Sequence, residues 1–554
     1  SDIILDSPTN NFCTLNPLNA AATCVISEGN LKYTTDHSAQ TLIKSSFNLT
    51  NKHYWEVFIV GVGGDGASGA IGIANPSALS KDGAYATWAD NQLVYHAADG
   101  NKSNGFGGSS ASYGAAYTTG DVIGIAVDVP SGTIQFFKNN SSQGTITDSA
   151  ITAQANSVGL FPILSNNSTS GSKSFIANFG QDSSFASNKP PQFKRDLRNQ
   201  AEFYYEPPAG FLALCSNNLP EPAFIPSEYF NTVLWTGDGS EEVVTGVGFQ
   251  PDWIWVKARN AAVNHKVFDA VRGLGSLRPN TTGAEDTNTS ENLTSYDSDG
   301  FTMKDPDHIV DNRTVVAWNW KAGNATLASN AFTQGSIAST CNRSVEAGFS
   351  IVSYTGTGSN ATVGHGLSKA PDFFVTKTRN NTGDWMVYYG DSTDFLKLNA
   401  SNATEDLAAV WNDTSPTSSV FSLGSNGDVN TNGRTYITYC FHSVDGYSKV
   451  GLYTGNGNVN GPFTYTGFRP AFVIYKRLTN GADWHMFDNK RDPFNEADLT
   501  LFPSGANAEG AGDDLDFLSN GFKQRSTGAE ANTNGDSYVY IAFAEMPFSH
   551  SNAR

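Results

Sequence analysis

The sequence contains few basic residues for its length. Its 554 residues include 34 Lys and Arg against 53 Asp and Glu, which gives a formal net charge of −19. Proteins that bind nucleic acid need a basic surface for the phosphates, and proteins that dock on anionic membranes need clustered Lys and Arg. The composition therefore argues against nucleic acid and against a membrane as partners. We expect the negative charge to serve solubility.

Cysteines and long apolar runs are also scarce. The five cysteines are spread over the chain: Cys13, Cys24, Cys215, Cys341 and Cys440. They are too few and too scattered for a disulfide framework, although a bond between Cys13 and Cys24 stays an open alternative to two free thiols. No run approaches the roughly 18 apolar residues of a membrane-spanning helix. The sequence starts at Ser1 without a signal-like segment, as expected of a processed or truncated product.

The motifs of common catalytic sites are absent as well. The chain has no G-x-S-x-G nucleophile elbow, no H-E-x-x-H motif, no phosphate-binding G-x-x-x-x-G-K loop and no cysteine pair at zinc spacing. Residues 61–66 fit the G-x-G-x-x-G dinucleotide pattern, which requires a helix directly afterwards. The apolar stretch 70–74 predicts a second strand instead, so we interpret 61–66 as a hairpin loop.

Clustered carboxylates offer a remaining route to catalysis or metal binding. Residues 297–300 resemble part of a calcium loop but lack its other ligands, so they predict a turn. Glu285 with Asp286, and the acidic stretch 513–516, would act as glycosidase acids only if they faced each other across a sugar. We interpret both groups as solvated loops and His485 as a core or rim residue. The sequence predicts no enzyme activity, no cofactor and no metal.

Internal repetition is the dominant feature that is present. The stretch Pro-Asp-Trp-Ile-Trp-Val-Lys-Ala-Arg at 251–259 returns in altered form at 371–379 and at 470–477, with lysine six residues after proline each time. Each copy predicts a buried strand that Pro opens, and we expect the Lys and Arg at its end to reach water. A long apolar strand closes each repeat: 314–320, 435–441 and 538–543. Repeats of about 100 residues built from strands and turns have the size of β-sandwiches.

These landmarks divide the chain into six parts. They are an extended arm at 1–23, a β domain at 24–187, a Pro-rich linker at 188–228 and repeats at 229–325, 345–447 and 448–554. Residues 322–344 separate the first two repeats, whereas almost nothing separates the last two, which we expect to stack rigidly. The sequence thus predicts an elongated all-β protein of tandem antiparallel β-sandwiches with less than about 10% helix.

The β domain resembles a known family. The segments that carry the likeness are 52–57, 71–74, 120–128, 132–139, 160–164 and 177–181. In this order they resemble a SPRY (B30.2-like) domain. The resemblance implies a bent sandwich of two antiparallel sheets that engages partners through the loops at one rim. Trp88, Tyr95 and Tyr113 lie in the long loops of this domain and are the candidate binding residues, with core packing as the alternative.

The three repeats resemble a second family. Together with the ends of the chain, at 6–12 and 543–554, they resemble repeats of no known chemistry in virion structural proteins of marine tailed bacteriophages. The resemblance implies a virion protein, which we expect to be a tail fibre or comparable appendage that binds a glycan or surface protein of the host. The expected contacts are with other virion proteins through the N-terminal region and with copies of itself, as a trimer by analogy with other phage fibres.

Three other functions remain open at this stage. A head fibre or decoration protein would carry the same kind of domains on the capsid. A polysaccharide depolymerase is a common phage spike, but its usual frame is a long β-helix of short repeats rather than sandwich-sized ones. A secreted cellular adhesin would need a signal peptide and a surface anchor in the full gene.

Overall fold

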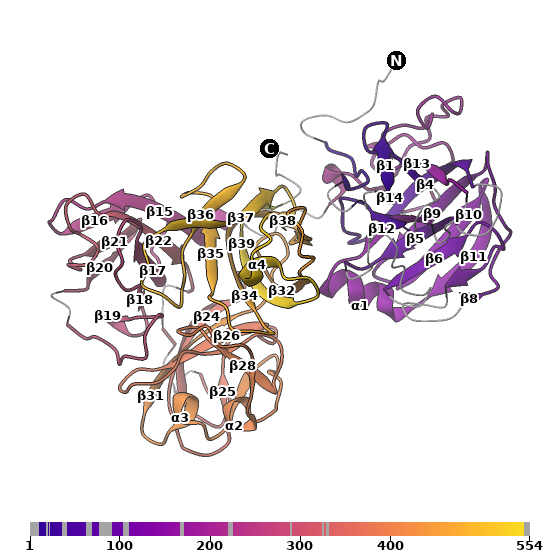
Figure 1. Cartoon of the computed structure of the whole chain (residues 1–554). Coiled ribbons are helices and arrows are strands. Elements are labelled where there is room, and N and C mark those ends of the chain that lie inside the picture. The colour runs from indigo at the N-terminus through magenta and orange to yellow at the C-terminus, as the bar shows by residue number, and fades with distance from the viewer. Residues whose placement is uncertain are drawn as a thin grey trace. The chain divides into compact units, whose positions relative to one another are not determined.

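The chain folds into two compact units, Ser1–Glu221 and Pro222–Arg554 (Figure 1). The computed structural model describes residues 10–17, 20, 23–35, 41–62, 69–76, 91–103, 110–166, 171–219, 225–288, 291–323, 326–327 and 332–547. Strands account for 45% of the residues and helices for 5%, which confirms the predicted all-β class of antiparallel sandwiches. Among the described helices, none has the length and apolar character needed to span a membrane.

The first unit is a sandwich of two sheets. The first sheet runs in the order β1 (Cys24–Ser27), β2 (Lys32–Thr35), β13 (Ser174–Asn178), β4 (Lys52–Gly61), β9 (Val122–Asp128), β10 (Thr133–Lys138) and β11 (Ser141–Thr147). The second runs in the order β3 (Thr41–Lys44), β12 (Phe161–Asn166), β5 (Gly69–Ala74), β6 (Gln92–His96), β7 (Lys102–Ser103) and β8 (Ser110–Ala111). Helix α1 (Ser149–Ser157) starts at Asp148, whose carboxylate accepts a 2.9 Å hydrogen bond from the Ala150 amide.

The segment that follows this sandwich folds back onto it. Strand β14 (Leu212–Ala213) pairs with β4 in parallel, and Cys215 forms a β-bridge with Phe12. The stretch interpreted from sequence as a linker from residue 188 is therefore part of the first unit through residue 219, and Phe12 of the expected arm packs there too. Cys13 and Cys24 are not joined by a disulfide bond.

The second unit contains the three repeats, each with a large sheet. In the first repeat the order is β15 (Phe230–Thr236), β22 (Thr314–Trp320), β17 (Trp253–Ala258), β18 (Lys266–Asp269) and β19 (Gly273–Leu277). In the second it is β23 (Ser339–Ser344), β24 (Phe349–Thr355), β31 (Thr435–Phe441), β26 (Phe373–Thr378), β27 (Met386–Tyr388), β28 (Asp394–Lys397) and β29 (Glu405–Asp406). In the third it is β32 (Ser448–Thr454), β39 (Ser537–Pro547), β34 (Phe468–Arg477) and β35 (His485–Asp488).

Smaller sheets complete the repeats. They are β16 (Glu242–Thr245), β21 (Gly300–Met303) and β20 (Leu293–Asp297) in the first, β25 (Ala361–Gly364) and β30 (Val420–Leu423) in the second, and β33 (Phe463–Tyr465), β38 (Gly521–Gln524), β37 (Gly510–Leu518) and β36 (Ala497–Thr500) in the third. The first unit also contains the 3₁₀ turn η2 (Ser216–Asn218), and the second begins with the 3₁₀ turn η3 (Pro226–Glu228). Short α-helices lie in the second repeat, α2 (Ala408–Trp411) and α3 (Gly427–Asn430), and in the third, α4 (Ala529–Asn532).

Strand register shows that the repeats are structurally equivalent. Trp253 lies opposite Trp320 in the first, Phe373 opposite Phe441 in the second and Phe472 opposite Phe543 in the third. The closing strands β22 and β31 have the bounds that the sequence predicts. Pro470 does not open its strand: it lies inside β34, where the register shifts, and such a bulge spares the ladder donor that proline lacks.

A single hydrophobic core joins the three repeats. Each large sheet packs one face within its own repeat and the other against this shared core. At its centre the Phe543 ring centroid lies 5.5 Å from that of Trp320 and 5.7 Å from that of Phe441. This double burial explains why the strands are apolar on both faces. The repeat pattern did not indicate that the first and third repeats would meet.

Candidate functional site

The predicted rim residues of the first unit have different surroundings. Tyr95 lies in β6 and is buried, with its ring packed 5.0 Å from Tyr117 and 5.2 Å from Phe136. Tyr113 is half-buried and meets Tyr95 edge to face at 5.5 Å. Trp88 lies outside the described residues. Tyr95 is thus placed to support the rim, whereas Tyr113 has ring surface for a ligand, and its binding role stays a prediction.

Hydrogen bonds fix the loop that carries Tyr113. The Tyr113 hydroxyl donates to the Gly144 carbonyl, and the Ala115 amide donates to Gln143 Oε1 at 2.8 Å. Lys102 Nζ lies 5.9 Å from the Tyr113 ring centroid, within reach of a cation–π contact. The aromatic surface at this rim is therefore held in place before any partner binds, which lowers the entropy cost of binding.

A buried carboxylate ties residues 188–219, which we call the C-terminal extension of the first unit, to the sandwich. Glu56 in β4 accepts 2.7 Å hydrogen bonds from the amides of Tyr204 and Tyr205 and a 3.2 Å bond from the Tyr54 hydroxyl. Burial outweighs these donors and raises the pKa of Glu56 to about 7. This carboxyl therefore changes its charge near neutral pH.

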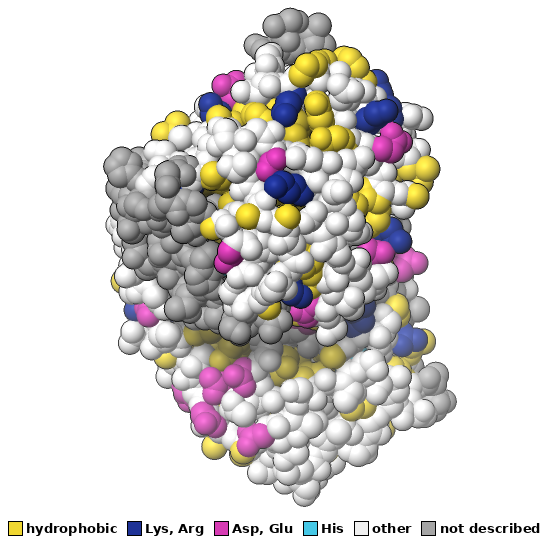
Figure 2. Space-filling model, turned by 90° about the vertical axis from the view of Figure 1, so that its right-hand side faces the viewer, with side chains coloured by type: hydrophobic (Ala, Val, Ile, Leu, Met, Phe, Trp, Pro, Cys, Tyr) yellow, Lys and Arg dark blue, Asp and Glu magenta, His cyan; other side chains and the backbone are white. Residues whose placement is uncertain are grey.

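A turn of this extension forms an unusual surface that we call the basic patch. It consists of Phe193, Lys194, Arg195, Leu197 and Arg198, all of them exposed. The side chain of Phe193 is 56% exposed and that of Leu197 is 73% exposed. The upper part of the surface in Figure 2 shows this combination of hydrophobic and basic side chains. In a chain of net charge −19, the patch is a local reversal of charge.

The basic patch has a rigid base. The buried carboxylate of Asp196 accepts hydrogen bonds from the Gln200 amide at 2.8 Å, the Ala213 amide at 3.1 Å and Asn218 Nδ2 at 2.8 Å. Lys194 also forms a backbone bridge with Phe203. These bonds fix the turn, so its exposed side chains project from a defined backbone.

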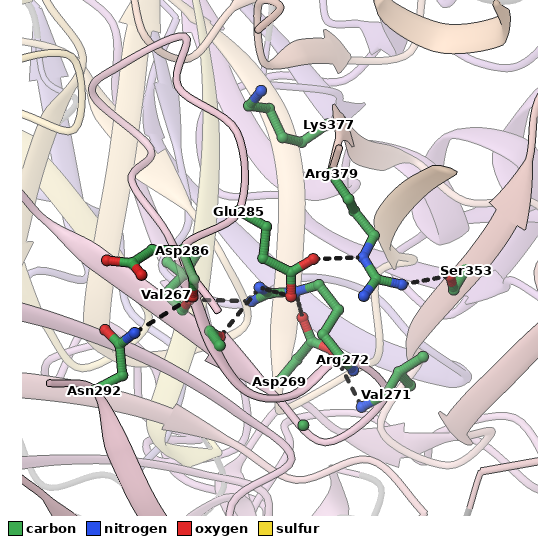
Figure 3. Close-up of polar contacts among 12 residues, drawn as sticks. Val267, Asp269, Val271, Arg272, Glu285, Asp286, Asn292, Ser353, Lys377 and Arg379 are labelled. Carbon is green, nitrogen blue, oxygen red and sulfur yellow. Dashed lines mark hydrogen bonds and ion pairs between the residues drawn. The ribbon is translucent and has the colours of Figure 1, made fainter. Parts of the chain in front are cut away.

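The second unit contains a buried ionic network between the first and second repeats. Glu285 lies between two arginines: Arg272 Nη1 is 3.1 Å from one carboxylate oxygen, and Arg379 Nε of the second repeat is 2.8 Å from the other (Figure 3). Arg272 Nε also binds Asp269 at 2.5 Å, and the Tyr439 hydroxyl of the second repeat donates to Asp269 at 2.7 Å. Burial alone would lower the pKa of Arg272, but Asp269, Tyr439 and Glu285 beside it raise that pKa.

The same network recurs between the third repeat and the first. Arg491 binds Asp488 at 2.5 Å and Glu509 at 2.8 Å, and Glu509 also pairs with Arg259 of the first repeat at 2.8 Å. The indole of Trp318 donates to Asp488 at 3.0 Å, in the place where Tyr439 meets Asp269. Two of the three contacts between repeats therefore use one polar arrangement.

The contact between the second and third repeats keeps the backbone geometry but replaces every member of the network. The Thr404 amide donates to the Leu478 carbonyl at 3.0 Å. In the other two contacts the Glu285 amide donates to the Arg379 carbonyl and the Glu509 amide to the Arg259 carbonyl, both at 2.7 Å. Leu478 and Thr404 thus stand in place of an arginine and a glutamate. By register and spacing the remaining replacements are Tyr389 for Asp269, Ser392 for Arg272 and Ile541 for Tyr439.

A ring side chain marks each of the three contacts. Trp385 Nε1 donates to the Arg278 carbonyl at 3.0 Å, and Trp484 Nε1 donates to the Lys397 carbonyl at 2.9 Å. His265 Nε2 lies 3.1 Å from the Phe502 carbonyl. The second repeat thus binds the first, the third binds the second and the first binds the third. The three repeats form a closed ring within one chain.

The lysines at the ends of the repeated strands lie inside this ring, contrary to the expectation that they reach water. Lys257, Lys377 and Lys476 are fully buried, and burial lowers the pKa of each to about 8. Lys377 Nζ donates to the Thr282 carbonyl of the first repeat at 3.2 Å, and Lys476 Nζ donates to the Ser401 carbonyl of the second at 3.0 Å. Loop carbonyls, some from the neighbouring repeat, replace water around these ammonium groups.

An apolar cavity lies in the shared core. Its volume is about 40 Å³, and its lining comes from all three repeats, including Trp253, Phe373 and Phe472 at equivalent positions. Equivalent aromatic side chains of the three repeats therefore surround one apolar space.

The other sequence-level candidates have structural explanations. Glu285, interpreted from sequence as a solvated residue, is instead part of the ionic network, because Arg379 from a distant repeat covers it. Asp297 and Gly300 pair across a hairpin, as predicted, and His485 is buried, 3.1 Å from Glu530. Within the described part of the chain, no group of three or more His, Cys, Asp or Glu could hold a metal ion.

These structures correspond to two known domain classes. Residues 52–182 match the SPRY domain, a class of interaction domain. Residues 225–547, more than half of the chain, match the family described as "Domain of unknown function (DUF7483)". The chain belongs to this family.

Several known proteins resemble the first unit. The Ran-binding proteins 9/10 homolog of Drosophila melanogaster is 27% identical over 182 residues, which cover 31% of this chain and 18% of that protein. The chain therefore matches less than a fifth of the length of this curated relative. The SPRY domain of human HERC1 is 19% identical with a TM-score of 0.25, and the match covers 29% of this chain and 96% of that structure. The PSpry domain of TRIM65 is 14% identical with a TM-score of 0.24, and the match covers 30% and 89%.

Proposed function

We propose that the chain is a binding and structural protein of a tailed phage particle, a tail fibre or comparable appendage, and that the rim of its SPRY unit contacts the host receptor. The observation that carries the binding role is the SPRY domain itself, with the half-exposed Tyr113 on a fixed loop at its rim. The receptor would be a glycan or a surface protein, since aromatic rings suit both.

Support for the phage particle comes from the repeats. They and the ends of the chain resemble virion structural proteins of marine tailed phages, and the acidic, turn-rich composition suits exposure outside a cell. In this proposal the chain resides on the virion, contacts other virion proteins through its N-terminal region and assembles with copies of itself, as a trimer.

The proposed protein is not an enzyme. The buried acidic and basic groups of the second unit neutralise one another between repeats, so they are unavailable as proton donors or nucleophiles. Release of reducing sugar from host polysaccharide by the purified protein would show a depolymerase instead.

Antibody labelling of intact particles tests the location. We expect label on the tail, with none on particles exposed to pre-immune serum. Label on the head would favour a capsid fibre or decoration protein, and absence of label from particles would overturn the phage function.

Competition for host cells tests the rim. We expect the purified chain to block phage adsorption, and Tyr113→Ala to weaken this block by about tenfold or more, because a contact ring is lost. Tyr113→Phe is the matched control, since it keeps the ring and removes only the hydroxyl, which donates to the Gly144 carbonyl and accepts from the Phe136 amide. Equal blocking by the wild type and Tyr113→Ala would exclude this rim as the receptor site.

A further inference from the structure

The basic patch exposes the ring of Phe193 to solvent on a backbone conformation that is energetically unfavourable. Phe193 has a φ of +54°, in the left-handed region, and its side chain is 56% exposed. For a bulky residue this conformation is unfavourable by about 1 kcal/mol, and exposure of the ring adds no compensating burial. Strain that persists at an exposed aromatic residue points to a function outside the free chain.

Two cations of the patch have no acidic partner among the described residues. Arg195 is neutralised in part by Glu202, 2.8 Å away, whereas Arg198 meets only the Asn217 carbonyl, at 3.3 Å. Lys194 is exposed next to Phe193. Aromatic and arginine side chains are the residues most enriched at binding hot spots, so the patch has the composition of an interface for an acidic partner.

The first repeat has a surface of complementary chemistry, which we call the acidic tip. It consists of Asp238, Glu241, Val243, Val310 and Asp311, all of them exposed. Val243 is 65% exposed and Val310 is 40% exposed. The Gly239 amide donates to the Ile309 carbonyl at 2.7 Å, which holds the two loops of the tip together. The tip therefore combines carboxylates with exposed aliphatic side chains.

The other two repeats provide an internal comparison. Thr357 and Asn456 occupy the place of Asp238 in the aromatic-Thr-Gly-x-Gly turn. The glycine that ends this turn lies beside Asp311 in the first repeat, and beside Asn432 and Asn534 in the others. The same backbone thus carries neutral residues in two repeats and acidic residues only in the first, so the turn itself does not require the acidic side chains.

We propose that the basic patch of one copy of this chain docks on the acidic tip of a second copy. Lys194 and Arg198 would pair with Asp238 and Asp311, while Phe193 and Leu197 would cover Val243 and Val310. Such a contact joins two different surfaces, so it is heterologous. Copies joined head to tail in this way form a closed oligomer with cyclic symmetry. The proposal deepens the self-assembly in the proposed function and rests on it.

The test is sedimentation of the full chain at micromolar concentration and low salt. We expect an oligomer for the wild type and monomers for both the Lys194→Glu/Arg198→Glu and the Asp238→Lys/Asp311→Lys variants, with association weaker by about a hundredfold or more. The chain with all four substitutions should recover the oligomer, because the charges are complementary again. The Asn456→Lys/Asn534→Lys variant places the same charges on the neutral tip of the third repeat and should keep the wild-type mass.

A second variant separates contact from folding. Phe193→Gly removes the ring and releases the strained backbone, so it should raise the unfolding midpoint of the first unit while weakening association. A monomeric wild type would overturn both the contact and the self-assembly. An oligomer that neither charge-reversal pair affects would overturn the contact and leave the self-assembly standing. Absence of the chain from particles would overturn the phage function and leave the contact in place.

Discussion

At the scale of single residues, burial governs the ionisable groups in both units. In the second unit, Lys257, Lys377 and Lys476 stay inside because backbone carbonyls accept hydrogen bonds from their ammonium groups. In the first unit, Glu56 stays inside because amides and a hydroxyl donate to it. The polar partners reduce the desolvation cost without removing it, so all four groups retain pKa values shifted toward the neutral form.

Glu56 makes the stability of the first unit depend on pH. Its pKa is about 7 in the folded chain against 4.5 as the ordinary value. A raised pKa contributes stability that is fully present below the unfolded value and is lost as the pH rises through the folded value. We expect the unfolding free energy of the first unit to fall by on the order of 3 kcal/mol between pH 4.5 and pH 8 through this group.

Calorimetry of the wild type and Glu56→Gln at a series of pH values measures this contribution. The difference between the two proteins isolates Glu56, because all other titrating groups are shared. The wild type should lose stability relative to the variant as the pH rises. A constant difference between the two proteins would show that Glu56 has no raised pKa.

At the scale of elements, the three contacts between repeats differ as complete sets. Two contacts contain arginine, aspartate and glutamate, together with a Tyr or Trp side chain that donates a hydrogen bond to the aspartate. The third contact has uncharged residues in their places: Leu478, Thr404, Tyr389, Ser392 and Ile541. A buried charge without its partner is costly, whereas a fully paired set or a fully uncharged set is stable. Each contact between repeats therefore has either the complete ionic network or none of its charged members.

Replacement of one residue of the ionic network should thus lower the free energy of unfolding more than replacement of both residues of a pair. Glu285→Thr leaves Arg272 and Arg379 without a shared carboxylate, and we expect it to destabilise the second unit by about 3–5 kcal/mol. Adding Arg379→Leu, which recreates the Thr404–Leu478 pair, should recover part of this loss. Chemical denaturation of the two single variants and the double variant gives the coupling energy.

Glu405→Thr is the matched control for Glu285→Thr. Glu405 pairs with Lys397 at 3.0 Å, but both side chains are partly exposed, so we expect a change below about 1 kcal/mol. Additive effects at Glu285 and Arg379 would contradict a coupled network.

The elements themselves were largely predictable, and their contacts were not. The apolar stretches 314–320 and 435–441 coincide with β22 and β31, because alternation, β-branched residues and aromatic residues are local signals. Contacts such as Arg259 with Glu509 join residues from different repeats, and no local pattern records them. The sequence did carry one signal: the shared proline-to-lysine spacing aligns Leu478 with Arg259 and Arg379, but only the contacts between repeats give the missing arginine a meaning. At the rim, sequence located Tyr113 but did not distinguish it from the buried Tyr95.

At the scale of the whole molecule, the closed ring makes the second unit differ from a row of repeats. In a row each repeat contacts only its neighbours in sequence, and the first and last have free ends. Here the first and third repeats share both the ionic network and the aromatic core, in which the Phe230 and Phe543 ring centroids lie 5.2 Å apart. The stability of the second unit therefore depends on which repeats are in contact around the ring, and less on the order in which the chain connects them.

The ends of the second unit meet, which makes this property testable by circular permutation. Helix η3, which precedes the first repeat, packs against β39, the last strand of the third. The permuted protein would contain residues 1–224, then 324–547, a Gly/Ser linker and finally 225–323, so that Leu327 keeps its bridge to Cys341. One connection opens and one closes, so the change in loop entropy is small. We expect the second unit to unfold in one transition near the wild-type midpoint.

Calorimetry and tryptophan fluorescence check this outcome, because the first repeat supplies Trp253, Trp255, Trp318 and Trp320 to the shared core. If the first repeat were held mainly by its covalent connection to the second, it would unfold separately in the permuted protein and at a lower temperature. The ring instead holds it through Arg259 and Glu509 on one side and Glu285 and Arg379 on the other. Glu509→Thr in the permuted protein should therefore lower the midpoint of the same single transition, since the contacts that close the ring, rather than the order of the repeats along the chain, stabilise it.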